Sequence, residues 1–323
     1  MRRVSSVRNE VDKTSRHLIC QTSLLMCARK AILIANPRTG RYESNKKESI
    51  ASLTSYLGSL GVNVNLQLTE RPGHATEIAV LAAQNGVTDV IVAGGDGTIN
   101  EALQGLAGTQ ARLAIIPRGT ANVLARELNL PLDERKAIDV IARGNSRKIH
   151  LGLAIDETTN KNRYFVLMAG IGLDAAVVKR VQPGLKKRLG RGAFWLSGFS
   201  HLASWNLHQF QLEIDGITYQ STFAVIGKAA RYGSDLAITP RAQIDQPDFE
   251  VCIIDTFSRF RYLQLLSHAL GSGMPLNQRG VRFLRATRVR ATGNAPVQVD
   301  GELAGELPMT FAIAPFSLDV LVP

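Results

Sequence analysis

The chain has 323 residues, of which 45% are hydrophobic and 20% are charged; this balance excludes a disordered or fibrous protein and favours two globular domains. A formal net charge of +11 favours polyanionic partners, which include nucleic acid, anionic membranes and phosphorylated small molecules. The three cysteines, Cys20, Cys27 and Cys252, lack the spacing of a zinc site, so a reduced cytosolic chain is expected.

The N-terminal residues 1–28 are expected to form a poorly ordered extension. Arg2 and Arg3 precede an apolar patch, but acidic residues lie between, whereas a signal peptide has a purely basic start. Met26 lies just upstream of the first predicted strand and is an alternative start of translation. No apolar run in the sequence reaches the ~18 residues that a membrane-spanning helix needs.

Predicted strands and helices alternate in the first part of the chain. The strands are expected over residues 31–35, 62–68, 88–93 and 112–116. The helices are expected over residues 44–60, 73–85, 98–106 and 121–128. Strands separated by helices of this length imply βαβ crossovers and a parallel sheet with both faces covered. Residues 29–146 are therefore predicted to form a doubly wound α/β domain.

The pattern changes near residue 147, beyond which turns separate most of the predicted strands. These are expected over residues 148–155, 164–169, 210–214, 222–226, 236–239, 249–255, 289–291, 297–299, 309–314 and 318–322. Residues 185–207 are the exception, because they form a longer and partly helical segment. Residues 147–323 are predicted to form a β-rich domain, an antiparallel sandwich or barrel. Its last strands are expected to pack back on the first domain, with a ligand cleft between the two.

A glycine-rich segment follows the third predicted strand and opens a helix. It reads Gly94-Gly95-Asp96-Gly97-Thr98-Ile99-Asn100. Glycines let the backbone approach a ligand closely, and the free N–H groups of a helix start can bind phosphate oxygens. Asp96 adds a carboxylate where a phosphate-bound Mg²⁺ could sit. The alternative is a tight turn without a ligand, but three glycines in four positions favour phosphate binding.

A second glycine turn follows the next predicted strand and reads Pro117-Arg118-Gly119-Thr120-Ala121-Asn122. Strand ends at one edge of a parallel sheet form the usual ligand crevice. The two turns are therefore expected to face one pocket. Neither is a P-loop or a dinucleotide fingerprint, because the GK[ST] ending and the third glycine of those motifs are missing.

With these residues the sequence resembles the diacylglycerol kinase-type catalytic domain family, which includes bacterial diacylglycerol kinases and the sphingosine and ceramide kinases. The resemblance runs from about residue 31 to the C-terminus. The matching segments occur in order along the chain: Asn36-Pro37-x-x-Gly40, Thr69-x-x-Pro72-Gly73-His74-Ala75, Gly94 to Glu101, Pro117-x-Gly119-Thr120-Ala121-Asn122, Gly170-Ile171-Gly172-Leu173-Asp174 and Asp300-Gly301-Glu302. It implies a first domain similar to NAD kinases and phosphofructokinases, and a β-sandwich second domain.

The resemblance also implies roles for individual residues in ATP- and Mg²⁺-dependent transfer of phosphate to a lipid hydroxyl. The glycine-rich turn from Gly94 to Asn100 binds nucleotide, together with Asn36, Thr69 and Thr120. Glu302 is the expected catalytic base, and general-base help is worth ~10²–10⁴-fold in rate. Asp300 would organise the metal or the site. The alternative is that residues 300–302 only form a hairpin turn, since Asp-Gly is a common turn pair.

One segment departs from the family pattern. Family members usually carry an Asp-Asp-Gly-like stretch that helps to hold a structural metal, whereas this chain has Asp245-Gln246-Pro247-Asp248. Gln246 occupies the place of the metal-binding aspartate. Asp245 or Asp248 could compensate by a small shift, or the metal could be absent, and both alternatives stay open.

A basic and aromatic segment suggests contact with an anionic membrane. It contains Lys186, Lys187, Arg188 and Trp195, and each cation near such a surface adds roughly 1 kcal/mol. The alternative is a solvated basic helix packed on the sandwich. Nucleic acid is not expected as a partner, because the basic residues follow no recognised motif. The expected location is cytoplasmic, with peripheral association with the inner face of the membrane.

Three other functions are alternatives to a lipid kinase. An oxidoreductase site at Gly170-Ile171-Gly172 is disfavoured, because no acidic residue follows at ~20 positions. NAD kinase shares the glycine-rich turn and a two-domain plan. A catalytically inactive lipid-binding relative is suggested by Gln246, but Asp96 and Glu302 are present. The sequence leaves the acceptor lipid (diacylglycerol-like or sphingoid-like) and the oligomeric state open.

Overall fold

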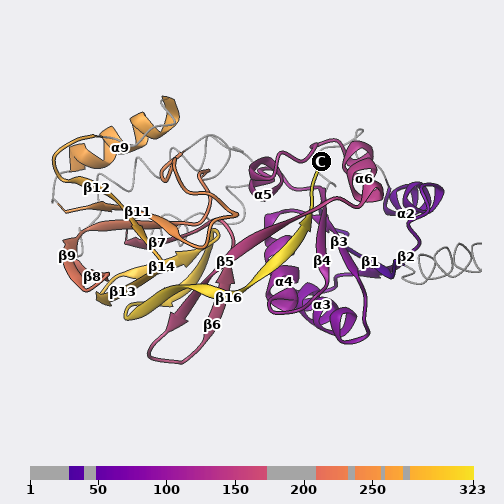
Figure 1. Cartoon of the computed structure of the whole chain (residues 1–323), viewed down its shortest axis with the longest axis horizontal. Helices are drawn as coiled ribbons and strands as arrows, with labels where there is room; N and C mark the ends of the chain where they lie inside the picture. The colour runs from indigo at the N-terminus through magenta and orange to yellow at the C-terminus, as the bar shows by residue number, and fades with distance from the viewer. Residues whose placement is uncertain (1–28, 40–48, 173–208, 232–236, 256–258, 272–276) are drawn as a thin grey trace, which may run out of the picture.

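The structure is a computed structural model that describes residues 29–39, 49–172, 209–231, 237–255, 259–271 and 277–323. The expected N-terminal extension over 1–28 and the expected partly helical segment over 185–207 lie outside these residues. Figure 1 shows an α/β half and a β-rich half, joined by long strands that run between them.

Four parallel strands form the sheet of the first half. They are β1 (Ala31–Ala35), β2 (Val64–Leu68), β3 (Asp89–Gly94) and β4 (Arg112–Pro117), in the order β2-β1-β3-β4. The helices of this half are α2 (Ile50–Ser59), α3 (His74–Gln84), α4 (Asp96–Leu106), α5 (Val123–Glu127) and α6 (Glu134–Arg143). The parallel pairing confirms the predicted α/β class.

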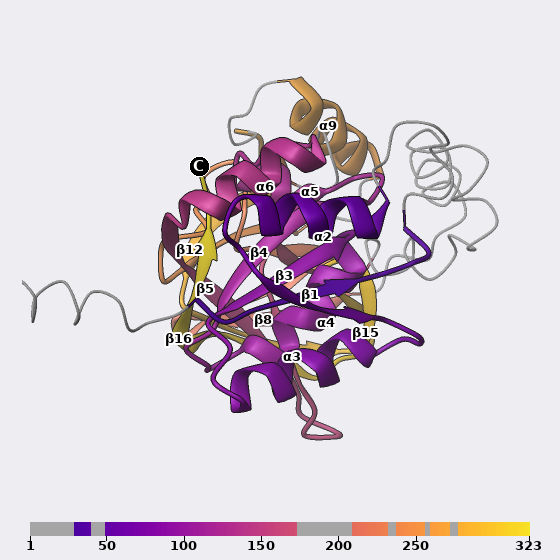
Figure 2. The same cartoon turned by 90° about the vertical axis from the view of Figure 1, so that its right-hand side faces the viewer.

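Both faces of the parallel sheet are buried, because successive side chains of a strand point to opposite sides. In β1, Ile32 and Ile34 join the core cluster that contains α3 and α4. Leu33 of the same strand joins the cluster that contains Leu57 of α2 and Ile138 of α6. Figure 2 shows α2 and α6 on one face of this sheet and α3 and α4 on the other.

Within the described residues, the first sheet continues beyond β4 into antiparallel strands and contains ten strands. The added strands are β16 (Met309–Leu321), β5 (Ser146–Asp156), β6 (Asn162–Phe165), β13 (Arg288–Gly293), β8 (Phe210–Ile214) and β9 (Ile217–Ser221). β16 lies parallel to β4 through Val320 and Leu113, and antiparallel to both β5 and β13. The last long strand therefore returns to the first half, at the edge of the parallel strands.

A second sheet of six antiparallel strands completes a sandwich. Its order is β12 (Val281–Ala286), β11 (Phe249–Ile254), β10 (Phe223–Gly227), β7 (Met168–Gly172), β14 (Pro296–Val299) and β15 (Glu302–Glu306). A core cluster joins the two sheets, and Phe165 of β6 stacks on Phe249 of β11 with 5.7 Å between the ring centroids. The predicted β-sandwich is confirmed.

Several predicted elements are wrong in detail. Residues 164–169 were expected to form one strand, but β6 ends at Phe165 and β7 begins at Met168, and these strands belong to different sheets. No strand covers residues 237–239 of the expected strand over 236–239. Helices α6 and α9 (Arg259–Gly271) were not predicted. The helix expected from residue 44 begins at Ile50, because the Ser49 hydroxyl caps it by accepting from Ser52 N–H.

The two strands expected over 309–314 and 318–322 form the single strand β16, interrupted by an irregularity. Its register against β5 shifts between Ile313 and Ser317, where Pro315 supplies no N–H for pairing. Phe316, inside this bulge, packs on Tyr164 with 5.4 Å between ring centroids. The bulge separates the part of β16 that pairs with β13 from the part that pairs with β4.

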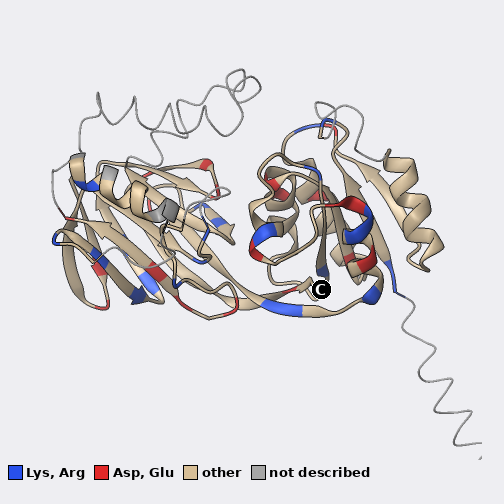
Figure 3. Cartoon of the chain, turned by 90° about the horizontal axis from the view of Figure 1, so that it is seen from above, with Lys and Arg blue, Asp and Glu red and all other residues tan. Residues whose placement is uncertain are grey.

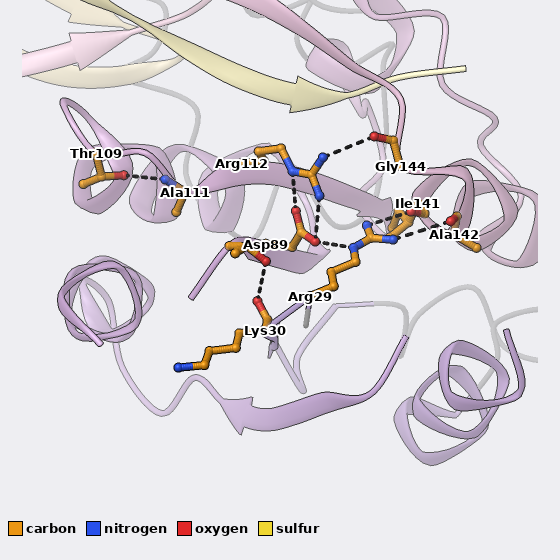
Figure 4. Close-up of polar contacts among 10 residues, drawn as sticks. Arg29, Lys30, Asp89, Thr109, Ala111, Arg112, Ile141, Ala142 and Gly144 are labelled. Atoms are coloured by element: carbon orange, nitrogen blue, oxygen red, sulfur yellow. Dashed lines mark hydrogen bonds and ion pairs between the residues drawn. The ribbon is translucent and has the colours of Figure 1, made fainter. Parts of the chain in front are cut away.

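A buried carboxylate ties the start of the parallel sheet together (Figure 4). Asp89 begins β3 and is fully buried. Arg112 of β4 donates to it through Nε at 2.7 Å and Nη2 at 3.0 Å, and Arg29 also pairs with it. The same arginines donate to the carbonyls of Ile141 and Gly144 at the end of α6. These contacts join β3, β4 and the end of α6 at the amino ends of the parallel strands, whereas the glycine-rich turn lies at their carboxyl ends.

Replacing Asp89 by alanine should lower the free energy of unfolding by roughly 2–3 kcal/mol. This is less than the cost of breaking a fully buried pair, because the side chains of Arg29 and Arg112 remain 23% and 28% exposed. Urea unfolding would measure the change. Glu77→Gln is the control, since it breaks the exposed Arg71–Glu77 pair and should leave stability nearly unchanged; equal effects of the two substitutions would contradict the prediction.

Candidate active site

The two glycine turns lie against one another at the carboxyl ends of β3 and β4. A β-carbon placed on Gly119 would lie 2.7 Å from the Cα atom of Gly95, so only glycine allows this approach. Arg118 N–H donates to the carbonyl of Gly94 at 2.9 Å. Asn122 closes the second turn, since its side chain accepts from Gly119 N–H and donates to Gly119 O. This contact is consistent with the expectation that the two turns face the same pocket.

Most of the residues predicted to bind nucleotide surround these turns. Asn36 follows β1, and its Nδ2 atom donates to Thr98 Oγ1 at 3.0 Å. Thr69 follows β2 and is held by its N–H to Ala35 O at 2.9 Å. Thr120 lies exposed in the second turn. The ends of four neighbouring strands thus supply one edge with polar groups.

Two residues of the predicted nucleotide segment point elsewhere. Ile99 is buried in the hydrophobic core, and its N–H donates to Gly95 O at 3.1 Å. Asn100 is also buried, and its side chain donates to Asp300 instead of facing the turn. The side chains of both residues are buried, so they stabilise the start of α4 and do not face the turn.

Asp96 links the two turns. Its Oδ1 atom accepts from Val123 N–H at 2.8 Å, at the beginning of α5. Burial raises the pKa of Asp96, while the backbone N–H groups of Leu124 and Val123 act in the opposite direction. One carboxylate oxygen is therefore already used by the fold, and the role of Asp96 as a ligand of phosphate-bound Mg²⁺ stays a prediction.

Asp300 lies between β14 and β15 and accepts hydrogen bonds from four donors. Oδ1 accepts from Leu167 N–H at 3.0 Å and Met168 N–H at 2.9 Å. Oδ2 accepts from Val166 N–H at 2.9 Å and Asn100 Nδ2 at 3.1 Å. Asp300 therefore fixes the segment between β6 and β7 against helix α4. The role of Asp300 in organising a metal or the catalytic site stays a prediction.

Glu302, at the start of β15, lies beside the glycine-rich turn. Its Oε1 atom is 3.7 Å from the position that a β-carbon on Gly97 would occupy. Its other oxygen, Oε2, pairs with Arg163 of β6. The side chain is 49% exposed, so it is accessible to a reacting group. A carboxylate thus stands where the N–H groups of a helix start could hold a phosphate.

Two residues around Glu302 and Asp300 belong to no motif of the sequence. Arg163 is part of no motif, and it pairs with Glu302, which is 139 positions further along the chain. Gln104 of α4 is the second residue; its Nε2 atom donates to Asn100 Oδ1 at 2.9 Å, and its Oε1 accepts from Tyr164 N–H at 2.9 Å. Spacing along the sequence gives no signal for either contact, because both depend on the strands of the second half.

The oxidoreductase alternative is excluded by the strand that carries its motif. Gly170, Ile171 and Gly172 belong to β7, which pairs antiparallel with β10 and β14. A dinucleotide fingerprint requires a turn from a parallel strand into a helix.

Residues of the segment for which the presence of a structural metal was left open have other partners. Asp248 pairs with Arg285, with 2.8 Å between Arg285 Nη2 and Asp248 Oδ1. The Gln246 carbonyl accepts from Lys228 Nζ at 2.6 Å. Across the residues that the structure describes, no group of three or more His, Cys, Asp or Glu side chains could hold a metal ion.

The predicted membrane-contact residues Lys186, Lys187, Arg188 and Trp195 lie outside the described residues. In Figure 3, Lys and Arg residues and Asp and Glu residues both occur along the described parts of each half. No helix within the described ranges is long and apolar enough to cross a bilayer.

Two family models match the chain in succession. The model of the diacylglycerol kinase catalytic domain matches residues 30–154. The model of the YegS C-terminal NAD kinase beta sandwich-like domain matches residues 168–322. Their order follows the α/β half and the sandwich described above.

Relatives and solved structures agree with these matches. The diacylglycerol kinase of Bacillus subtilis (strain 168) is 30% identical over 302 residues, which cover 91% of this chain and 97% of the relative. That of Staphylococcus aureus (strain MRSA252) is 29% identical over 301 residues, which cover 91% and 93%. A crystal structure of a diacylglycerol kinase from Bacillus anthracis str. Sterne has a TM-score of 0.69 at 18% identity, covering 91% of this chain and 97% of the other.

Asp300 should give the fold a measurable pH dependence. Burial raises its pKa to about 6, although the N–H groups of Val166, Met168 and Leu167 act in the opposite direction. The usual value is about 3.9, so between about pH 4 and pH 6 the folded chain binds more protons than the unfolded chain. This carboxyl group therefore makes the fold less stable as the pH rises through that interval.

The measurement is urea unfolding of the wild type and of Asp300→Asn at pH 4.5 and pH 7. The other titrating groups are common to both proteins and cancel in the difference. The wild type minus the variant should be higher at pH 4.5 than at pH 7 by roughly 2 kcal/mol, at about 1.4 kcal/mol for each pKa unit. A difference independent of pH would show that Asp300 titrates normally.

Proposed function

Because the chain belongs to the diacylglycerol kinase catalytic domain family, we propose that it is an ATP-dependent kinase that phosphorylates a hydroxyl group of a lipid. The acceptor is diacylglycerol-like or sphingoid-like. The observation that carries the proposal is the position of the Glu302 carboxylate next to Gly97. A proton acceptor and a phosphate-binding turn are both needed for phosphoryl transfer, and here they are adjacent.

The glycine turns would hold the phosphates of ATP. The first N–H groups of an α-helix such as α4 lack acceptors within the helix. The positive end of the helix dipole lies at the same place and favours an anion. The contact between Gly95 and Gly119 keeps the second turn beside the first, so that Thr120 and Thr69 can line the nucleotide site. When bound with ATP, Mg²⁺ would offset the charge of the phosphates, and Asp96 is the carboxylate of the turn that could approach it.

Glu302 would act as the general base. It would accept the proton of the lipid hydroxyl as that oxygen forms a bond to the terminal phosphorus of ATP, and the bond from this phosphorus to ADP breaks, so that ADP leaves. Arg163 pairs with one oxygen of the carboxylate and so fixes its orientation, leaving Oε1 on the side of Gly97. Asp300 holds the chain just before Glu302 and keeps the base in place relative to α4.

The lipid substrate implies that the protein acts at a membrane surface. A cytoplasmic enzyme associated with the inner face of the membrane is the arrangement we propose. The basic and aromatic segment with Lys186, Lys187, Arg188 and Trp195 is the candidate contact, since clustered cations bind anionic lipids and aromatic rings favour the interface.

Phosphorylation of NAD is the second candidate function. It is favoured by the match of residues 168–322 to a model described as NAD kinase beta sandwich-like. A lipid-binding protein without catalysis is the third candidate, and the glutamine at position 246 is the feature that suggests it.

The decisive experiment is transfer of labelled γ-phosphate from ATP-Mg²⁺ to a panel of lipids in mixed micelles, with NAD in the same panel. A labelled lipid is the expected product. Glu302→Gln should lower kcat by ~10²–10⁴-fold, because it removes the proton acceptor. Glu306→Gln, on the same strand and also exposed, is the control and should retain full activity.

Each other result of this assay selects another function. Labelled NAD without labelled lipid would assign NAD phosphorylation. No labelled product from protein that binds ATP would favour the non-catalytic lipid binder. Full activity of Glu302→Gln on a lipid would remove Glu302 from the role of base.

A methyl group on Gly119 should weaken ATP binding. In Gly119→Ala the new atom would meet Gly95 at 2.7 Å and Asn122 Oδ1 at 2.9 Å, forcing the turns apart. Calorimetric titration with ATP should show a Kd raised by about tenfold or more, equivalent to about 1.4 kcal/mol. Gly58→Ala in α2 is the control, since its nearest new contact is 4.0 Å away; an unchanged Kd for Gly119→Ala would place the nucleotide elsewhere.

A further inference from the structure

Lys228 is a charged side chain buried at the end of β10. Its exposed fraction is 0%. The Nζ atom donates to the carbonyl of Gln243 at 2.7 Å and to the carbonyl of Gln246 at 2.6 Å. Burial of an unpaired ammonium is costly, so these carbonyls are its required partners. The Lys228 ammonium thus binds the backbone at both ends of residues 243–246.

The surroundings of Lys228 act on its pKa in both directions. Burial lowers its pKa to about 8, and the carboxylates of Asp248 and Asp245 act in the opposite direction. The group is therefore mainly an ammonium at pH 7. The acidic residues nearby have further partners: Asp248 pairs with Arg285, and Glu250 accepts from Arg241 Nε at 2.8 Å. This corner of the sandwich is already neutralised by cationic side chains.

A structural metal does not fit these residues. Mg²⁺ and Ca²⁺ take several oxygen ligands, usually including a carboxylate. Here a lysine occupies two carbonyls of the segment, position 246 is glutamine, and Asp248 is bound to Arg285. A metal ion beside the Lys228 ammonium would also meet a like charge at short range.

We propose that the Lys228 ammonium is a built-in cation that takes the place of a structural metal, so that residues 243–248 fold without a metal ion. The proposal concerns this segment only. Mg²⁺ that arrives with ATP belongs to the nucleotide site, so the proposal and the kinase function can fail separately.

The backbone at Lys228 also contacts the segment that binds Asp300. The N–H groups of Lys228 and Ala229 donate to Leu167 O at 2.8 Å and 2.9 Å, and Leu167 N–H donates to Asp300. His150 N–H of β5 donates to Ile244 O at 2.9 Å. Lys228 therefore contacts residues 243–246 through its ammonium and the segment that presents the donors of Asp300 through its backbone N–H.

The first test uses the wild-type protein without ATP. Elemental analysis after purification should find no stoichiometric metal. Excess EDTA, MgCl₂ or CaCl₂ should each change Tm by less than about 1 °C. For comparison, a change of about 1 kcal/mol in the free energy of unfolding would shift Tm by about 2 °C or more. A metal ion bound at one per chain together with a fall in Tm on adding EDTA would overturn the proposal.

The second test replaces the cation itself. Lys228→Met keeps the aliphatic part of the side chain and leaves two carbonyls without a donor, so Tm should fall by roughly 5 °C or more. Lys136→Met is the control at a position exposed on α6 and should keep the wild-type Tm. An unchanged Tm in Lys228→Met would overturn the proposal; if the variant does not fold, the metal and EDTA measurements on the wild type decide.

Discussion

The hydrogen bonds of Asp300 are the interaction on which the arrangement of the two halves depends. One carboxylate accepts from the backbone of the segment between β6 and β7 and from Asn100 of α4. These contacts join the first sheet, the second sheet and the helix that follows the glycine-rich turn. The position of Glu302 follows from this, because it lies two residues further along the chain. Without these hydrogen bonds, the distance between Glu302 and the glycine-rich turn would depend only on how the two halves pack.

Much of the first half could be predicted from the sequence, because its signals are local. Buried apolar runs that end in glycine turns specify parallel strands and helix starts, and the resemblance indicates which turn is expected to bind nucleotide. The same reasoning located the Asp-Gly-Glu segment but gave only two alternatives for it, a hairpin turn or a catalytic base. The structure shows a turn, with Asp300 in the left-handed conformation at φ 47, and also a carboxylate facing Gly97. The two interpretations are therefore compatible.

The errors in the second half have a common physical cause. Residues 164–169 are apolar throughout, and nothing among them marks the break between β6 and β7, because the group that causes it is Asp300, more than 130 positions away. Lys228, which follows β10, donates to the carbonyl of Gln246, and no motif of the sequence marks this contact. Arg163 meets Glu302 in the same way. Contacts made by side chains across sheets leave no periodicity in the sequence.

The bulge in β16 has a mechanical consequence for any closing motion. Domains that close around a ligand usually turn about a flexible linker, but here β5 and β16 cross between the halves as a paired ribbon. Rotation of one half against the other must bend that ribbon. Its pairing is interrupted between Ile313 and Ser317, where an irregular strand already twists more strongly. Flexing would therefore concentrate at these residues, and Phe316, packed on Tyr164, would transmit it to the strand that carries Arg163.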